Sequence, residues 1–216
     1  MAPPDSSSAT SPVEFVAETN LPTGRGTYRV RAYRDLVDST EPVAIVHGDV
    51  SGLSCVPVRV HDECYTSEVL GSLKCDCREQ LAFGMDYIRK RGPGVVIYLR
   101  QEGRGIGLAN KIAAYALQED GHDTVDANRL LGLPDDSRRY DAAAAILRDL
   151  GVESIKLLTN NPRKLDLLGE LGVQIEGRIP VFIQANEHSA GYLVAKAARM
   201  GHLMDEEALP EAADAS

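Results

Sequence analysis

Hydrophobic and polar side chains alternate along the first third of the chain, and this period of two predicts β-strands. The alternation covers Tyr28 to Tyr33 and Val56 to His61, and Val43 to His47 forms a further apolar segment between them. No helical pattern separates these segments. We therefore expect the N-terminal part of the chain to form an antiparallel β unit.

From Leu81 onward, helical repeats of apolar residues alternate with short β-branched runs. The predicted helices contain Leu81 to Ile88, Leu108 to Glu119, Ala142 to Leu150, Pro162 to Leu171 and Ala190 to Met200, and the predicted strands are Val95 to Leu99, Ile155 to Leu158 and Val181 to Ile183. Alternating strands and helices imply an α/β layer. The fold class is thus α/β: one domain over residues 13–204, in which the antiparallel β unit packs with the α/β layer, between disordered tails at residues 1–12 and 205–216.

Three of the four cysteines lie close together in the sequence, at Cys64, Cys75 and Cys77. Thiolates are preferred ligands of zinc, and three protein ligands leave one position of a tetrahedral ion open to water, as in catalytic zinc sites. The alternative is a set of reduced, buried cysteines that act as small hydrophobic residues. The charged residues beside these cysteines argue against full burial. The fourth cysteine, Cys55, precedes a predicted strand, and we expect it in the core.

The strand before this cluster is predicted to have an apolar and a polar face. Val58 and Val60 share one face, and Arg59, His61 and Glu63 point to the other, toward whatever the cysteines bind.

The sequence from His61 to Glu63 also matches the H-x-E start of the zinc nucleobase deaminase signature, which requires P-C-x-x-C as its second part. Here one residue separates Cys75 from Cys77, and Lys74 stands in place of the proline. We therefore reject a deaminase.

Basic or glycine-rich segments lie at two predicted strand-to-helix junctions, Gln101 to Gly107 and Thr159 to Lys164. Glycines let a ligand approach the backbone, and helix N-termini favour anions. Lys164 in a first helical turn opposes the helix dipole, a conflict that an anionic ligand would repair. Arg138 and Arg139 form a third basic cluster, for which a solvated loop is the default interpretation. Together these segments predict a polyphosphate site.

One face of a predicted helix carries Lys111, Tyr115 and Gln118. The polar residues on this face suit the wall of a solvent-filled site.

The bulk properties narrow the class of protein. The chain has 216 residues and a formal net charge of −9, which argues against nucleic-acid wrapping. Its N-terminus lacks the basic and apolar regions of a signal peptide, and its apolar runs are too short to span a membrane. The clustered cysteines do not suggest a disulfide scaffold. We expect a cytoplasmic protein with no nucleic-acid or membrane partner.

Five segments, RVHDEC, GSLKCDC, RQEGRGIGL, DTVDAN and LLTNNPRK, in this order and spacing, resemble GTP cyclohydrolase II over about residues 17 to 204. The resemblance implies zinc-dependent hydrolysis of GTP to 2,5-diamino-6-(5-phosphoribosylamino)pyrimidin-4(3H)-one, formate and diphosphate, the first step of riboflavin biosynthesis. It also implies a homodimer, with one Zn²⁺ per subunit and Mg²⁺ on the GTP triphosphate.

Residue roles follow from the matched motifs. Cys64, Cys75 and Cys77 would hold zinc. Asp136 would be the proton acceptor, Arg138 the nucleophile at the α-phosphate, and Tyr115 would help to position the purine. The GTP-binding residues would be Arg59, Val60, His61, Asp62, Glu63, Gln80, Glu102, Gly103, Arg104, Thr124, Thr159 and Lys164.

The base near the zinc and the role of Arg138 can also be considered from the chemistry of the side chains. Three thiolates acidify a zinc-bound water less than three neutral histidines do, so a nearby base is needed, and Glu63, beside Cys64, is the candidate. A guanidinium is protonated and has no free lone pair, so an electrostatic clamp is the simpler role for Arg138, and covalent attack, with Asp136 accepting a proton, is the alternative.

Two other functions remain open from the sequence. One is a paralogue that opens the imidazole ring and releases diphosphate but retains the formyl group. The other is a zinc-stapled nucleotide-binding protein without turnover.

Overall fold

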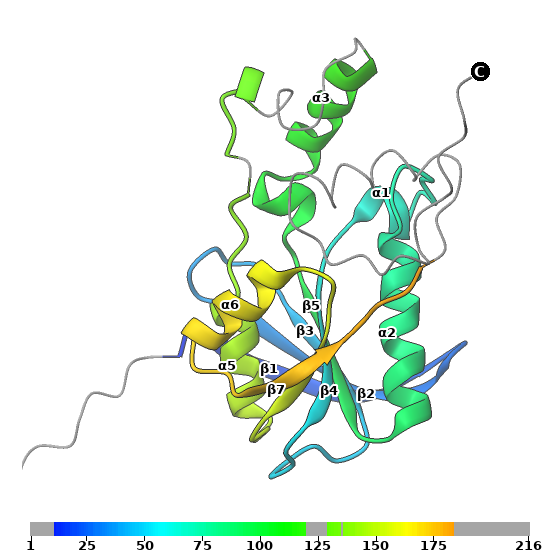
Figure 1. Ribbon diagram of the computed structural model, residues 1–216, viewed down its shortest axis with the longest axis vertical. Coiled ribbons are helices and arrows are strands. Elements are labelled where there is room, and N and C mark those ends of the chain that lie inside the picture. The colour runs from blue at the N-terminus through cyan, green and yellow to red at the C-terminus, as the bar shows by residue number, and fades with distance from the viewer. Residues whose placement is uncertain (1–10, 120–128, 135, 184–216) are drawn as a thin grey trace, which may run out of the picture.

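The computed structural model describes residues 11–119, 129–134 and 136–183. Within these residues, seven strands form one mixed sheet in the order β1-β2-β3-β5-β4-β6-β7 (Figure 1). The strands are β1 (Val13–Thr23), β2 (Gly26–Asp35), β3 (Val43–His47), β4 (Val56–Asp62), β5 (Gly94–Leu99), β6 (Ile155–Leu158) and β7 (Ile175–Ile179). The helices are α1 (Tyr65–Glu68), α2 (Cys77–Arg91), the 3-10 helix η1 (Glu102–Gly105), α3 (Leu108–Glu119), α5 (Asp141–Asp149) and α6 (Pro162–Glu170).

The expected α/β class is confirmed, with one correction to the N-terminal part. The pairs β1–β2, β2–β3 and β3–β5 are antiparallel, whereas β4 pairs in parallel with both β5 and β6. The sequence analysis placed β4 in the antiparallel unit because no helix precedes it. The helix that decides its direction is α2, which follows β4 and returns the chain to β5 in the same direction.

Two edge strands differ from the sequence prediction. β1 was not predicted, because all its side chains except Val13 are exposed and pairing with β2 is what holds it. The last strand within the described residues is β7, which pairs with β6, whereas the predicted strand from Val181 to Ile183 is irregular. The predicted helix from Ala190 to Met200 and the tail at 205–216 lie outside the described residues, as do residues 1–10 of the N-terminal tail.

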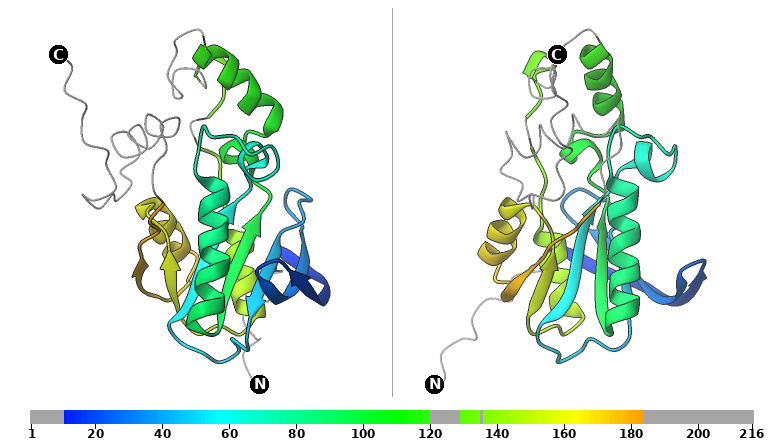
Figure 2. Two further views of the ribbon diagram at one scale, coloured as in Figure 1. Left: turned by 90° about the vertical axis from the view of Figure 1, so that its right-hand side faces the viewer. Right: turned by 45° about the vertical axis from the view of Figure 1, so that its right-hand side comes forward.

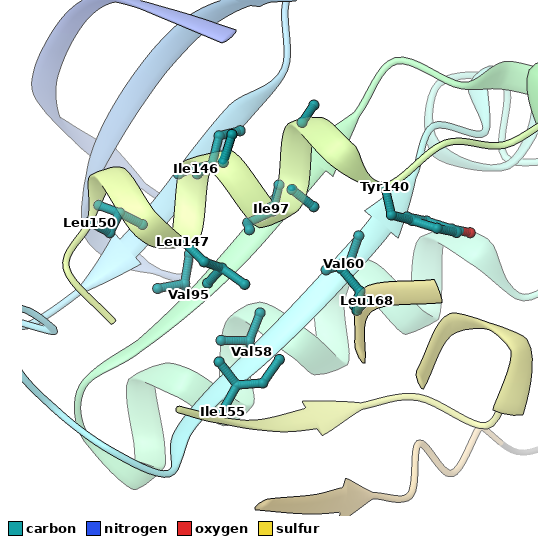
Figure 3. Packing of buried hydrophobic residues seen from close by; sticks show 14 of the residues in the cluster. Val58, Val60, Val95, Ile97, Tyr140, Ile146, Leu147, Leu150, Ile155 and Leu168 are labelled. Carbon is teal, nitrogen blue, oxygen red and sulfur yellow. The ribbon is translucent and has the colours of Figure 1, made fainter. Parts of the chain in front are cut away.

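Helices cover both faces of the sheet, with α2 on one face and α5 and α6 on the other (Figure 2). Because side chains alternate along a strand, β4 and β5 contribute to both layers. The larger cluster contains Val58 and Val60 of β4 with Ile146 of α5 and Leu168 of α6 (Figure 3). Each such fully buried aliphatic side chain stabilises the fold by ~1.5–3 kcal/mol.

The division of β4 into an apolar and a polar face is confirmed for Val58 and Val60 against Arg59 and His61, but the polar face lies under α2, which was not predicted. Arg59 and His61 are buried there, and a Cβ added to Gly84 of α2 would lie 3.2 Å from Cγ of Arg59. Helix α2 therefore packs directly on this polar face.

The carboxyl ends of the parallel strands meet at one edge of the sheet. β4 ends at Asp62, β5 at Leu99 and β6 at Leu158, so the loops that follow them emerge side by side. Helices α1 and α3 lie beyond this edge (Figure 1). In open α/β sheets, ligands bind outside the carboxyl ends of the strands.

No helix among the described residues has the length and apolar character needed to cross a membrane.

Candidate active site

The three clustered cysteines converge just beyond the end of β4. Cys64 precedes α1, Cys77 is the first residue of α2, and Cys75 lies in the loop between them. Their sulfur atoms lie within 4.8 Å of one another, and the Sγ atoms of Cys64 and Cys75 are 3.6 Å apart. Zn–S bonds of ~2.3 Å at tetrahedral angles place two sulfurs ~3.8 Å apart. The donor set therefore fits zinc, and no fourth His, Cys, Asp or Glu of the described chain joins it.

Cys55 does not belong to this cluster, and its predicted core position is wrong. It is exposed and has a φ of 58°, in the turn that precedes β4. Cys64 follows the other end of this strand, and a strand of this length spans ~20 Å.

The environment of Cys64 favours its thiolate. Hydrogen bonds from the thiols of Cys75 and Cys77 lower the pKa of Cys64, and the charge of Lys111 adds to the effect. A thiolate is the form that ligates a metal.

A carboxylate below the cluster fixes the backbone of Cys64. Glu68 Oε1 accepts a hydrogen bond from the Cys64 N–H at 2.9 Å and also lies 2.9 Å from His61 Nε2, whereas Oε2 accepts from the Tyr98 hydroxyl at 2.7 Å. The rings of His61 and Tyr98 stack with centroids 5.6 Å apart. Burial lowers the pKa of His61, so the imidazole supports this network as a neutral group.

Neither Glu68 nor Tyr98 was predicted from the sequence as part of the site. Glu68 stands four residues after Cys64, a spacing that suggests contact only once a helical turn is expected there. Tyr98 lies opposite His61 in the parallel register of β4 and β5, which strand pairing alone reveals.

A second cluster surrounds Asp62, the last residue of β4. Its Oδ2 accepts hydrogen bonds from Arg138 at 2.9 Å, Lys164 at 3.0 Å and the Tyr140 hydroxyl at 3.3 Å. Burial alone would raise the pKa of Asp62, but Lys164 and Arg138 outweigh it and hold the pKa below its ordinary value. Burial lowers the pKa of Lys164 to about 8, against the opposing effect of Asp62.

Asp62 balances the charge of Lys164, which the sequence places unfavourably in the first turn of a helix. Lys164 lies in the first turn of α6, and its side chain turns away from the helix to reach Asp62 and the Val60 carbonyl at 2.9 Å. The anion that the position calls for is therefore supplied by the chain itself. Asn161 caps the same helix by accepting a hydrogen bond from the Arg163 N–H at 3.1 Å.

Asp136 holds Arg138 in a fork-to-fork pair. The guanidinium donates to the two carboxylate oxygens at 2.9 and 2.7 Å, and Arg163 donates to the same carboxylate at 2.9 Å. Burial would lower the pKa of Arg138, but the hydrogen bonds to Asp136 and the charge of Asp62 raise it above its ordinary value. Arg138 is therefore a fixed, charged guanidinium.

Gln101 joins the loop after β5 to the segment that carries Arg138. Its side-chain amide donates to the Arg139 carbonyl at 2.9 Å and accepts from the Arg139 N–H at 2.7 Å. The two segments also meet at Gly105, where an added Cβ would lie 2.6 Å from Oγ of Ser137. From the sequence, Gln101 was only the first residue of a candidate phosphate segment, and this contact was not predicted because its partner is a backbone segment distant in sequence.

Several of the predicted GTP-binding residues are buried and contact other parts of the protein beside the site. Arg59 is buried and donates to Gln80 at 2.6 Å and to the Leu158 carbonyl at 3.0 Å. Val60 belongs to the core, and Thr159 is buried with its hydroxyl accepting from the Asn161 N–H at 3.0 Å.

Others lie around the metal cluster. Glu63 pairs with Arg100 at 3.1 Å. Glu102 accepts hydrogen bonds from two backbone N–H groups, those of Tyr65 and Gly103, at 2.6 and 2.7 Å.

Positive φ angles of 62° and 63° at Gly103 and Arg104 turn the chain between β5 and α3. The ring of Tyr115 on α3 has the Lys74 ammonium 4.7 Å from its centroid. Thr124 lies outside the described residues.

The cationic cluster around Asp62 and the three-cysteine cluster are neighbours because both begin at the carboxyl end of β4. Asp62 organises the cationic cluster, and Cys64, two residues later, begins the thiol cluster. The arrangement suits a substrate that carries a phosphate chain at one end and a group open to metal-assisted hydrolysis at the other.

Comparison with known proteins agrees with this chemistry. The family model described as GTP cyclohydrolase II matches residues 14–180. The GTP cyclohydrolase-2 of Picrophilus torridus is 48% identical over 191 residues, covering 88% of this chain and 99% of that protein. Riboflavin biosynthesis protein RibBA of Bacillus subtilis is 51% identical over 196 residues, covering 90% of this chain and 49% of that protein.

The RibBA protein of Synechocystis is 51% identical over 184 residues, 33% of its own length. The chain thus spans about half or less of these RibBA relatives and nearly the whole of the Picrophilus relative. With a family model that matches most of the chain and relatives of this similarity, the chain belongs to the GTP cyclohydrolase II family of enzymes.

Proposed function

We propose that this protein hydrolyses GTP to 2,5-diamino-6-(5-phosphoribosylamino)pyrimidin-4(3H)-one, formate and diphosphate, as the first step of riboflavin biosynthesis. The observation that carries the proposal is the placement of the three-cysteine cluster beside the buried Asp62–Arg138–Lys164 cluster at one edge of the sheet. GTP offers a triphosphate for the second cluster and an imidazole carbon for the first.

Cys64, Cys75 and Cys77 would hold one Zn²⁺ per subunit. Bound there, zinc supplies a water-derived nucleophile at neutral pH, which suits attack on the imidazole carbon of guanine. Glu68 keeps the loop that carries Cys64 in place through the Cys64 N–H.

Glu63 is the proposed base on the purine side. Its side chain is 18% exposed and lies next to Cys64, where it can exchange its contact with Arg100 for a proton of the attacking water. Glu63→Gln should slow formate release more than it weakens GTP binding. A variant with an unchanged rate of formate release would remove Glu63 from this role.

Arg138 and Lys164 would bind the phosphates. Cleavage between the α- and β-phosphates builds negative charge on oxygen, and a positioned guanidinium stabilises it without being consumed. The fork-to-fork pair with Asp136 and the raised pKa of Arg138 support this clamp over a covalent attack by Arg138, which needs a neutral guanidine. Asp136 then orients Arg138.

The remaining parts of the proposal come from the resemblance to the family. Mg²⁺ would accompany the triphosphate, since hard divalent ions bind phosphate oxygens. Tyr115 and the residues around Gly103, Arg104 and Thr124 would position the nucleotide. We further propose that the protein works as a cytoplasmic homodimer.

Incubation of the purified protein with GTP and Mg²⁺, with separate assays of formate and diphosphate, tests the function. Both products are expected. Diphosphate without formate would point to a paralogue that retains the formyl group. Neither product, with nucleotide and zinc still bound, would point to a non-catalytic binding protein.

A further inference from the structure

Lys111, which the catalytic scheme does not use, reaches a sulfur of the metal cluster. Its Nζ lies 3.1 Å from Sγ of Cys64 and 2.7 Å from Oε1 of Glu102. Lys111 projects from α3 with a side chain only 13% exposed. An ammonium held between a carboxylate and a thiolate is placed to donate to both.

The carboxylate partner is itself fixed. Glu102, 9% exposed in its side chain, accepts hydrogen bonds from the backbone N–H groups of Tyr65 and Gly103. Tyr65 directly follows Cys64, so the same carboxylate holds the loop of the metal cluster and the ammonium that faces it. Lys111 thus has a defined geometry and not merely a nearby charge.

A lysine side chain ordinarily carries an ammonium at neutral pH. The Glu102 carboxylate and the Cys64 sulfur, to which Lys111 donates at 2.7 and 3.1 Å, both suit that charged form.

The consequence concerns the charge on the metal. Three thiolates around a divalent ion give a formal charge of −1, and strong donation by sulfur makes the ion a weaker Lewis acid. Hydrogen bonds to ligating sulfurs draw electron density away from the metal, as they do in other thiolate-bound centres. The Thr66 hydroxyl, 3.6 Å from the same Sγ, adds a weaker contact.

We propose that Lys111, anchored by Glu102, is a positioning residue that hydrogen-bonds the Cys64 thiolate and so restores Lewis acidity to a three-thiolate metal site. The inference rests on the proposed function, because it assumes that the cysteines hold a metal during ring opening. It assigns Glu102 a structural part in the site, as the anchor of the ammonium.

The test uses Co²⁺ as a spectroscopic probe in place of zinc, with the 216-residue chain. Thiolate-to-cobalt charge-transfer bands report the electron density on sulfur without any turnover. In Lys111→Met the sulfur loses its charged donor, so these bands should move to longer wavelength. Lys111→Arg keeps a charged N–H donor, and its bands should stay near those of the wild type.

Lys74→Met is the matched control. It removes a charge from the same side of the site, where Lys74 lies 49% exposed beside Tyr115. A shift as large as that of Lys111→Met would show a general field effect and overturn the proposal. Unchanged bands in Lys111→Met would overturn it as well.

Activity gives a second measurement on the zinc-loaded enzyme. Lys111→Met should lower the ratio of formate to diphosphate by ~10-fold or more, in line with the loss typical of partners behind a metal ligand. An unchanged ratio contradicts the proposal.

If Lys111→Met does not fold, Glu102→Gln replaces it, and a smaller shift in the same direction is expected. Unchanged bands in that variant reject the anchoring role. Wild-type protein without any thiolate-to-cobalt band would instead refute the metal site of the proposed function itself.

Discussion

The Asp62→Asn substitution tests whether one carboxylate holds the cationic cluster together. Asp62 Oδ2 contacts Arg138 and Lys164 at 2.9 and 3.0 Å, and the three side chains are between 5% and 13% exposed. Asparagine keeps the shape and an acceptor oxygen but leaves two buried cations without their shared anion. Removing one partner of a buried ion pair costs ~3–5 kcal/mol.

The lower value of about 3 kcal/mol is appropriate because Asp136 still pairs with Arg138. For a chain of this size, 1 kcal/mol shifts Tm by ~2–4 °C, so we expect Tm to fall by about 6–12 °C. Differential scanning calorimetry of the wild type and the variant measures this shift. The surface pair of Arg25 and Asp86 is 43% and 32% exposed, and Asp86→Asn should lower Tm by less than ~4 °C.

A ligand measurement separates charge from packing. Inorganic triphosphate can replace the missing anion, so it should raise the Tm of Asp62→Asn more than that of the wild type. If Asp62→Asn melts within ~2 °C of the wild type, the carboxylate does not carry the charge balance of Arg138 and Lys164, and the reasoning is refuted.

Three further predictions follow from the same region. Arg138→Lys should retain part of the diphosphate release that Arg138→Met loses, since a clamp needs only charge; isolation of a phosphoramidate on Arg138 would instead favour covalent attack. Gly105→Ala should destabilise the protein by ~1–3 kcal/mol in urea denaturation, because the φ of Gly105 is +87° and the added Cβ meets a neighbouring loop. Gly52→Ala is the control: its φ is +69° but the added Cβ meets open space, so only the smaller cost of the positive φ is expected. The pKa of Lys164 is about 8 in the folded protein against an ordinary 10.5, so the unfolded chain binds more protons between these values and the contribution of Lys164 to stability rises with pH in that window. GTP affinity should fall over the same window as the ammonium is lost, and Lys164→Arg, measured by a pH series of KM, should remove that fall.

Features that depend on residues close together in the sequence could be predicted from the sequence. The spacing of Cys64, Cys75 and Cys77 predicted a set of thiols that could hold a metal, because Cys75 and Cys77 are almost adjacent and Cys64 lies only 11 residues before Cys75. The apolar run of β5 and the start of α6 at Pro162 were equally local, since periodicity, proline and capping act within one turn or one strand.

Order within the sheet and the charge balance of the site depended on contacts between distant residues. Direction and position of β4 follow from pairing with β5 and β6, and Asp62 meets Lys164 across 102 positions of sequence. Sequence analysis could find Lys164 as a misplaced cation but not the carboxylate that balances it. The two edge strands escaped prediction for a related reason, since little of their surface is buried and pairing alone defines them.

The sequence by itself thus determined which residues could supply the chemistry, thiols that can hold a metal and cations that can bind phosphates, together with most of the helices and strands that carry them. Only the tertiary structure decided that Glu68, Tyr98 and Gln101 surround those residues and that Lys111 contacts Cys64, because these contacts join helices, strands and loops that converge when β4, β5 and β6 lie side by side. Local periodicity carries no information about such convergence, since the free energy that selects it comes from burial and pairing across the whole sheet.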